Sequence, residues 1–244
     1  MLKIIGDIFR GIRDIIYPET CVVCGDKPVN GSIDGAVCLK CWNGIRKNVP
    51  PFCPRCGRSL QEAGVENGTC RECRSDPPCF DRAFSACVYE GVVKDLIHKF
   101  KYNGKDHLAK PLGRILTEFI RDYSIPLDRI DLIVPVPLHP AKFREREFNQ
   151  AQLLGAEIAK TFKKEISTGN LIRRRYTKSQ AGLESQQRAD NVKDSFAVKN
   201  PGLLKGKNIL LVDDVMTTTA TSSEAGKALK NAGAKTVIVL TLAD

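Results

Sequence analysis

The strongest constraint on the fold is a set of eight cysteines arranged as four C-x-x-C pairs. These pairs are Cys21/Cys24, Cys38/Cys41, Cys53/Cys56 and Cys70/Cys73. Thirteen residues separate the first pair from the second and the third from the fourth, and an offset of 32 maps the first four cysteines onto the last four. Pro18 and Gly25 map onto Pro50 and Gly57 by the same offset. The shared offset indicates an internal duplication.

Each C-x-x-C places two sulfurs on one tight turn, and two such turns supply four ligands for tetrahedral zinc. The pattern therefore predicts two structural zinc sites of the ribbon type, each with four cysteine ligands and without an open coordination position. We expect each set of four to close its own site, although pairing the first C-x-x-C with the third would satisfy the same chemistry. Disulfides are a further alternative, but no secretory signal is evident. Cys79 and Cys87 fall outside the pattern, and we expect both to be small buried residues.

Residues 1–17, ahead of the cysteines, are expected to form a separate amphipathic helix, because their apolar residues recur at three- and four-residue steps. These are Leu2, Ile5, Ile8, Phe9, Ile12, Ile15 and Ile16. We expect this apolar face to pack on the zinc module or on a second subunit, and docking to a membrane surface is the alternative. Residues 18–80 would then form a double zinc-ribbon module. No run of eighteen apolar residues is present, so no membrane-spanning helix is expected.

From residue 81 to 244, apolar strands alternate with amphipathic helices. Strands are expected at 84–89, 131–137, 209–212 and 237–242, and helices at 92–100, 108–123, 149–162 and 221–231. This order is typical of an α/β domain with an open, mainly parallel sheet that helices cover. Ligands of such sheets bind beyond the carboxyl ends of the strands. We therefore expect the chemistry just after Val134 and just after Val212.

The segment that follows Val212 combines two acids with a run of hydroxyl residues. Asp213 and Asp214 come first, and Thr217 to Thr221 lead into the helix. Carboxylates accept hydrogen bonds from sugar hydroxyls, and the N-terminus of a helix offers unpaired N–H groups to a phosphate. The pattern therefore suits a sugar phosphate. A simple helix cap without any ligand is the alternative.

The run VDDVMTTTAT at 212–221 resembles the phosphoribosyl-diphosphate (PRPP) loop of type I phosphoribosyltransferases. The segments LIHKFKYNGK (96–105), VPVPLH (134–139) and REREFNQAQLL (144–154), with the stretch from Thr177 to Phe196, resemble the ComF family of competence-associated, phosphoribosyltransferase-like proteins. The doubled cysteine module is similar to the zinc module of that family. The resemblance spans about residues 17–243, and it implies a Rossmann-like type I phosphoribosyltransferase fold behind a small N-terminal zinc-ribbon domain.

The resemblance also implies roles for individual residues. Asp213 and Asp214 would bind the ribose hydroxyls of PRPP, with Mg²⁺ held mainly by PRPP oxygens. The 5′-phosphate would lie against Thr217, Thr218, Thr219, Ala220 and Thr221. The pyrophosphate loop would consist of Pro135, Val136, Pro137, Leu138 and His139. A flexible basic loop that neutralises departing pyrophosphate would contain Arg173, Arg174, Arg175 and Lys178. A solvated loop or a nucleic-acid contact is the alternative for this loop, and no catalytic residue is assigned.

Three positions depart from the patterns of the relatives. Thr219 and Glu147 stand where the family has glycine. Because glycine permits positive φ and close approach of the backbone to a phosphate, we expect Thr219 to weaken PRPP binding. Glu147 adds bulk and negative charge near a basic groove. Thr217 stands where purine-salvage relatives have an acid, which argues against hypoxanthine or guanine as the acceptor.

The formal charge of +10 bears on the choice of function. It falls to about +6 if eight thiolates bind two zinc ions, so it supports nucleic-acid binding only modestly. Basic stretches lie at 94–110, 142–146 and 173–178, and a solvated surface is their alternative. The resemblance implies a cytoplasmic accessory protein of natural transformation that handles incoming single-stranded DNA beside the uptake machinery at the inner membrane. The alternatives are an active phosphoribosyltransferase with an unidentified acceptor and a PRPP-sensing scaffold without turnover.

Overall fold

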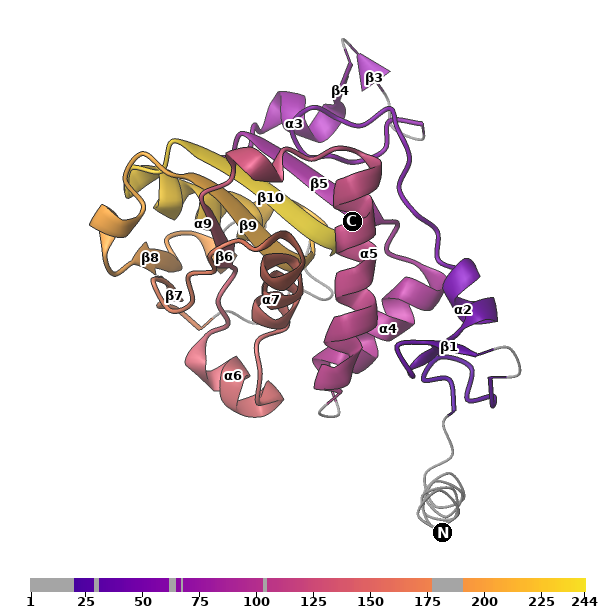
Figure 1. Ribbon diagram of the computed structural model, residues 1–244. Coiled ribbons are helices and arrows are strands. Elements are labelled where there is room, and N and C mark those ends of the chain that lie inside the picture. The colour runs from indigo at the N-terminus through magenta and orange to yellow at the C-terminus, as the bar shows by residue number, and fades with distance from the viewer. Residues whose placement is uncertain (1–19, 29–30, 62–64, 67, 103–104, 177–190) are drawn as a thin grey trace.

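A four-stranded parallel sheet forms the centre of the protein in the computed structural model, which describes residues 20–28, 31–61, 65–66, 68–102, 105–176 and 191–244 (Figure 1). The order is β5 (Arg82–Cys87), β10 (Thr236–Ala243), β9 (Asn208–Val215) and β6 (Leu132–Pro135). The helix expected over residues 1–17 lies outside the described residues. Across the described part of the chain, the helices are too short or too polar to span a bilayer.

The central strands β9 and β10 are apolar on both faces because each face is covered. Along β9, Leu210 and Val212 belong to one core while Ile209 and Leu211 belong to the other, as the two-residue period of a strand requires. β9 is longer than the sequence predicted, since it runs to Val215. Both acids therefore lie within β9 and not after its end. Asp213 is opposite Thr241 of β10.

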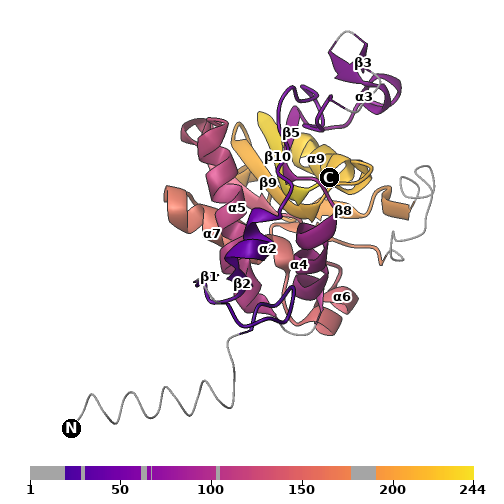
Figure 2. The same cartoon turned by 90° about the vertical axis from the view of Figure 1, so that its right-hand side faces the viewer.

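The two faces of the sheet carry different layers (Figures 1 and 2). One core contains side chains of α4 (Gly91–Lys101), α5 (Ala109–Asp122) and α7 (Gln150–Phe162) together with the first zinc ribbon. The other contains side chains of α9 (Ala220–Asn231), the β7–β8 pair (Leu171–Arg173 and Phe196–Val198) and the second ribbon. Helix α6 (Pro140–Arg146) follows β6, and 3₁₀ turns lie at Asp106–Leu108, Leu127–Arg129 and Pro201–Leu203.

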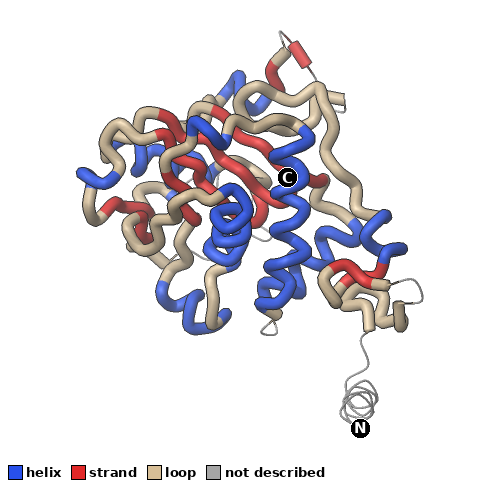
Figure 3. The backbone as a smooth tube through the Cα atoms, viewed as in Figure 1, coloured by secondary structure: helices blue, strands red, loops and turns tan. Residues whose placement is uncertain are grey.

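The two ribbons repeat the same order of elements, a short antiparallel pair followed by a one-turn helix (Figure 3). The first consists of β1 (Ser32–Ile33), β2 (Val37–Cys38) and α2 (Leu39–Asn43). The second consists of β3 (Val65–Glu66), β4 (Thr69–Cys70) and α3 (Arg71–Ser75). The duplication seen in the cysteine spacing is thus also present in the backbone, although the two copies pack in opposite cores.

Both outer strands of the sheet have a further segment along their free edge. The link between the ribbons lies antiparallel to β5, where Asn48 N–H donates to the Ala86 carbonyl and Val88 N–H to the Arg46 carbonyl. Beside β6, Ile133 donates to the Glu165 carbonyl and also accepts from Ser167 N–H. Each edge strand is therefore hydrogen-bonded on both sides over part of its length.

Candidate functional site

Each zinc ribbon gathers its own four cysteines, as the sequential grouping predicted. The four sulfur atoms of a ribbon all lie within 4.8 Å of one another. The Sγ atoms of Cys24 and Cys38 are 3.9 Å apart, and those of Cys56 and Cys70 are 3.6 Å apart. A zinc tetrahedron with Zn–S bonds of about 2.3 Å has edges of about 3.8 Å, so both clusters fit a four-thiolate zinc site. All ten cysteines are free thiols, and both the interleaved grouping and the disulfide alternative are wrong.

Backbone N–H groups prepare the first cysteine of each ribbon for metal binding. Burial alone would raise the pKa of Cys21, but backbone donors, with Cys38 N–H 3.3 Å from its sulfur, lower that pKa to about 6. Burial would also raise the pKa of Cys53, but backbone donors lower that pKa to about 7. Because zinc binds the thiolate, such donors favour the ligating form near neutral pH.

The two cysteines outside the pattern differ from each other. Cys87 is buried as expected, and burial raises the pKa of its thiol to about 12. Cys79 is exposed, so the expectation of a buried residue was wrong there. The chain at Cys79 crosses α9, where its N–H donates to Ser223 Oγ at 2.9 Å and its carbonyl lies close to Gly226. The backbone of Cys79 packs against the helix, and its side chain therefore points outward.

The acid pair at the end of β9 lies in a charged, mostly desolvated setting. Asp214 is 9% exposed and forms an ion pair of 3.1 Å with Lys101 at the end of α4. Burial alone would lower the pKa of Lys101, but the charge of Asp214 outweighs it and raises that pKa. Burial raises the pKa of Asp213 to about 7, and the charge of Asp214 adds to the effect. Asp214 thus has a cationic partner at its carboxylate, whereas Asp213 titrates near neutrality.

Three further cations, one from β7 and two from α6, gather near Lys101 and the acid pair. Arg173, at the end of β7, interacts electrostatically with Asp213, while burial lowers the pKa of the guanidinium. Burial lowers the pKa of Lys142 in α6, and the charges of Arg173 and Arg146 lower it further. Arg146 Nε is buried and has no hydrogen-bond partner in the part of the chain that the structure describes. These three side chains and Lys101, here called the cation cluster, suit a ligand that carries several phosphate oxygens.

The FNQA motif explains how two members of the cation cluster are positioned. Asn149 caps α7 by accepting from Ala151 N–H, and its amide donates to the Val136 carbonyl at 3.0 Å. Gln150 is buried, donates to the Phe100 carbonyl beside Lys101, and accepts from Arg146. The motif therefore connects the loop after β6 with the ends of α4 and α6. The family resemblance of the sequence included this motif, but it did not indicate Lys101, Lys142 or Arg146 as site residues.

The two residues that replace family glycines both have left-handed backbone conformations. Thr219 has φ +57° at the N-cap of α9, and Glu147 has φ +67° at the C-cap of α6. Thr219 makes no side-chain capping hydrogen bond, so the N-terminus of α9 is not closed by its own cap. This is the geometry in which glycine is favoured and a β-branched residue is strained. The turn that precedes α9 therefore adopts its left-handed conformation at a conformational cost in this chain.

The structure places Arg173 of the predicted basic loop close to the predicted pyrophosphate loop, with which it lines one pocket. Arg173 faces the acids, whereas Arg174 and Arg175 are exposed, and Lys178 lies outside the described residues. In the loop after β6, Val136 N–H donates to the Val212 carbonyl and His139 Nδ1 accepts from Ala141 N–H. His139 thus caps α6 and packs edge-on against Tyr176. Its placement supports a structural role for the histidine within that loop.

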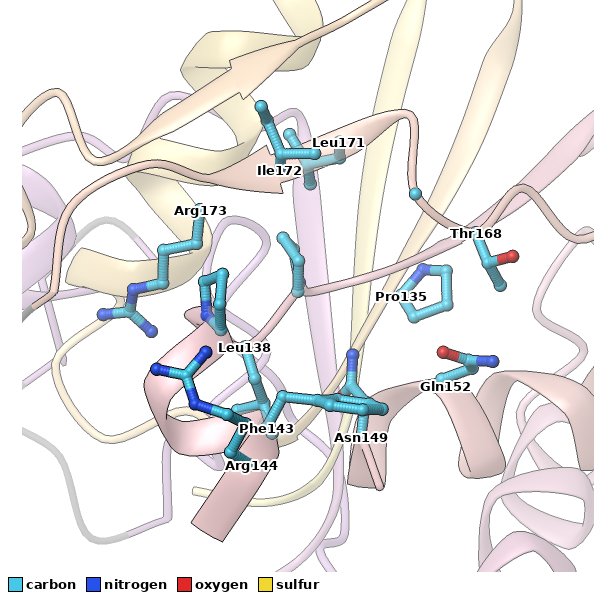
Figure 4. A pocket seen from close by; sticks show the side chains of 13 residues that line it. Pro135, Leu138, Phe143, Arg144, Asn149, Gln152, Thr168, Leu171, Ile172 and Arg173 are labelled. Carbon is cyan, nitrogen blue, oxygen red and sulfur yellow. The ribbon is translucent and has the colours of Figure 1, made fainter. Parts of the chain in front are cut away.

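A mainly apolar pocket of about 380 Å³ adjoins the loop after β6 (Figure 4). Arg144 and Arg173 lie at one end of it, and Thr168 and Gln152 at the other. Pro135 and Leu138 of the predicted pyrophosphate loop form part of its wall. The pocket and the acid pair therefore share Arg173, which connects the β7 strand to both.

The second ribbon contacts the predicted phosphate turn directly. Arg58 donates to the Thr217 carbonyl at 3.4 Å and forms an ion pair of 3.0 Å with Glu72. Gly57, beside it, packs so closely on β5 that an added Cβ would lie 2.3 Å from the Ala83 carbonyl oxygen. This ribbon is therefore fixed to both the sheet and the turn that follows β9.

Comparison with known proteins agrees with both halves of the chain. A double zinc ribbon domain matches residues 12–78, and a phosphoribosyl transferase domain matches residues 150–244. The DNA utilization protein YhgH of Salmonella typhi is 31% identical over 207 residues, which cover 83% of this chain and 88% of that protein. The chain belongs to the ComF family.

Other relatives include proteins named for competence. Competence protein F of Haemophilus influenzae is 29% identical to this ComF-family chain over 212 residues, or 85% of this chain and 90% of that one. Among solved structures, glutamine PRPP amidotransferase from B. subtilis, complexed with ADP and GMP, has a TM-score of 0.37 and 21% identity. That match covers 55% of this chain and 25% of the amidotransferase.

Proposed function

We propose that this protein binds Mg²⁺-PRPP at the carboxyl edge of its sheet and handles incoming single-stranded DNA during natural transformation. The names of the relatives, competence protein and DNA utilization protein, support the second part. The acid pair enclosed by the cation cluster carries the first part. We place the protein in the cytoplasm, beside the DNA-uptake machinery at the inner face of the membrane.

The proposed PRPP complex uses each part of the site for one portion of the ligand. Asp213 and Asp214 accept hydrogen bonds from the 2′ and 3′ hydroxyls of the pentose. The backbone N–H groups from Thr217 to Thr221, with the N-terminus of α9, receive the 5′-phosphate. The loop from Pro135 to His139 and the cation cluster receive the pyrophosphate. Mg²⁺ supplies charge neutralisation on the phosphate oxygens.

Phosphoribosyl transfer is the second candidate function, and the cation cluster favours it. In that reaction the C1–O bond to pyrophosphate breaks and a bond forms from C1 to a nucleophile, whose proton leaves to a base. The developing charge on pyrophosphate would lie close to Arg146 and Arg173, which are already desolvated. No base is assigned, and a binding protein without turnover uses the same residues.

Calorimetric titration tests whether Mg²⁺-PRPP binds at the acid pair. The wild type should bind, and a variant with both Asp213→Asn and Asp214→Asn should lose binding at least tenfold, which corresponds to about 1.4 kcal/mol. Asp122→Asn, an exposed acid at the end of α5, is the matched control and should leave affinity unchanged. Equal absence of heat in wild type and double variant would remove PRPP as the ligand.

The remaining parts of the proposal need their own assays. Release of pyrophosphate from Mg²⁺-PRPP across a panel of nucleobases and amines would establish turnover, and a bound but unchanged ligand would favour a binding role. Fluorescence anisotropy with a labelled single-stranded oligonucleotide should give an affinity that falls steeply with salt. A protein that binds no oligonucleotide at low salt would contradict the DNA part and leave the PRPP part standing.

A further inference from the structure

A cavity of about 600 Å³ lies between the second zinc ribbon and the segment that links the two ribbons, at the carboxyl ends of β5 and β10. Its charged lining consists of Arg46, Lys47, Arg58, Arg71, Glu72 and Asp244. The ribbons lie on opposite sides of this region in Figure 2, with the end of β10 between them. The cavity is separate from the acid pair, but it adjoins the phosphate turn because Arg58 donates to the Thr217 carbonyl.

One oxygen of the Asp244 carboxylate lacks a hydrogen-bond donor among the described residues. Its Oδ1 accepts from Asn48 Nδ2 at 2.8 Å. Its Oδ2 is buried and has no hydrogen-bond partner among the residues that the structure describes. Burial raises the pKa of this carboxyl against the opposing effect of Asn48. A buried acceptor without a partner is costly, so a ligand that brings an N–H or O–H group into the cavity gains from meeting it.

The balance of charge in the cavity lining favours an anion. Four cations and two carboxylates line the cavity. Arg46 pairs with Glu90 and Lys47 with Glu118 outside the cavity, and the side chains of the first pair are about half exposed. Exposed pairs of this kind contribute little and are readily exchanged for a phosphate. Arg71 forms no ion pair with any described residue.

We infer that this cavity holds one nucleotide of a single-stranded DNA chain, with its phosphate on the arginines and an amino group of its base donating to Asp244. Its volume suits a ligand of nucleotide size. None of the described residues that line it is aromatic. The base is therefore recognised at its edge and not by stacking, and a carboxylate accepts well from the N4 amino group of cytosine.

This inference deepens the proposed DNA handling and rests on it, because it names where a nucleotide of the strand lies. Arg58 is the residue that connects the cavity to the PRPP site, since it belongs to the cavity wall and contacts the phosphate turn. A nucleotide phosphate at Arg58 would compete with Glu72 for the guanidinium, whose ion pair is 3.0 Å long. The DNA strand and the phosphate turn would thus both contact the guanidinium of Arg58.

The test compares two labelled decanucleotides, oligo(dC) and oligo(dT), by fluorescence anisotropy over a range of salt concentrations. The wild type should prefer oligo(dC) by roughly fivefold, and Asp244→Ala should remove that preference. Arg71→Ala should weaken both oligonucleotides by roughly three- to tenfold and reduce the salt slope by about 1. Arg55→Ala is the matched control, because it removes an exposed arginine of the same ribbon outside the cavity.

The outcomes distinguish this inference from the function on which it rests. Wild type that binds neither oligonucleotide overturns both. Binding that is unchanged by Asp244→Ala and equally affected by Arg71→Ala and Arg55→Ala overturns the cavity alone. Thermal unfolding followed by circular dichroism checks that each variant is folded. In Asp244→Ala, the Asn48 amide can still donate to the Ser85 and Cys87 carbonyls. Because Arg71 lies on the surface, its variant tests the inference even if Asp244→Ala unfolds.

Discussion

Lys101 Nζ lies 3.1 Å from Asp214 Oδ2, although the two residues are far apart in the sequence and come from different layers of the fold. The side chains are 20% and 12% exposed. Such a pair leaves an uncompensated charge when one partner is removed, and the cost then exceeds what the intact pair contributes. The relationship therefore ties the end of α4 to the end of β9, which is where the proposed pentose lies.

Replacing Lys101 by methionine tests this relationship. The variant keeps the length of the side chain but leaves Asp214 without its cation, so we expect the free energy of unfolding to fall by about 3 kcal/mol. Chemical denaturation at pH 7 measures the change. Lys94→Met, at an exposed position of α4, is the control and should change stability by less than about 0.5 kcal/mol. Equal effects of the two variants would contradict the importance of the ion pair.

The pKa of Asp213 predicts a pH dependence of stability. Folding raises this pKa from 3.8 to about 7, so between these values the folded protein retains a proton that the unfolded chain has lost. The free energy of unfolding should therefore fall as pH rises from about 4 to 7, and level off above. Asp213→Asn should remove most of this slope, whereas Asp122→Asn should retain it. Denaturation midpoints at several pH values would reveal the difference.

Restoring the family glycine at position 219 should stabilise the protein. Thr219 has φ +57°, a conformation that costs a β-branched residue about 1–2 kcal/mol. Glycine loses about 0.5–1 kcal/mol through chain entropy, so we expect Thr219→Gly to raise the free energy of unfolding by about 0.5 kcal/mol. Thr221→Gly, inside α9, should lower it by a similar amount. Calorimetry should also record tighter Mg²⁺-PRPP binding by Thr219→Gly, and weaker binding would contradict the phosphate assignment.

The duplicated glycines provide a matched pair. Gly25 and Gly57 have φ +78° and +74°, so alanine strains both backbones alike. A Cβ at Gly25 would meet nothing within 4 Å, whereas one at Gly57 would lie 2.3 Å from the Ala83 carbonyl oxygen. Gly57→Ala should therefore destabilise by about 2 kcal/mol more than Gly25→Ala, as measured by thermal unfolding. Similar losses for both would show that the second ribbon does not pack firmly on β5.

Loss of metal from the two ribbons should have unequal consequences for PRPP. Cys56→Ser weakens the ribbon that holds Arg58, which contacts Thr217, and should reduce Mg²⁺-PRPP affinity by roughly fivefold through the disturbed phosphate turn. Cys24→Ser, the counterpart in the first ribbon, should leave that affinity within about twofold. Zinc content by atomic absorption must show the loss of about one ion per chain in each variant. A larger effect from the first ribbon would overturn the coupling.

Periodic and repeated patterns carried most of the predictive information. The 32-residue offset predicted two closed cysteine sites, and alternation of apolar strands and helices predicted the parallel sheet. The end of β9 was placed too early because aspartate is rare in strands, yet Asp213 pairs with Thr241 there. The sequence pattern could not reveal that Cys79 is exposed, because its exposure depends on how the chain crosses α9.

The cation cluster could not be assembled from the sequence for a different reason. Lys101 and Arg146 lie at the C-terminal ends of helices, where basic residues are common and usually serve only to complement the helix dipole. Lys142, near the start of α6, belongs to a basic stretch of the kind that solvated surfaces carry. Their convergence on the acids depends on buried Gln150, which bonds to the ends of both α4 and α6. Only tertiary structure distinguishes such a lysine from an ordinary solvated one.

The segments that flank β5 and β6 limit how this protein can associate with others. Residues 46–48 occupy the outer side of β5, and residues 165–167 occupy that of β6. Over those stretches a strand from another molecule would have to displace an existing neighbour before it could join the sheet. Assembly partners would therefore be expected to recognise side chains and loops, which a change of surface residues can alter without rebuilding the interior.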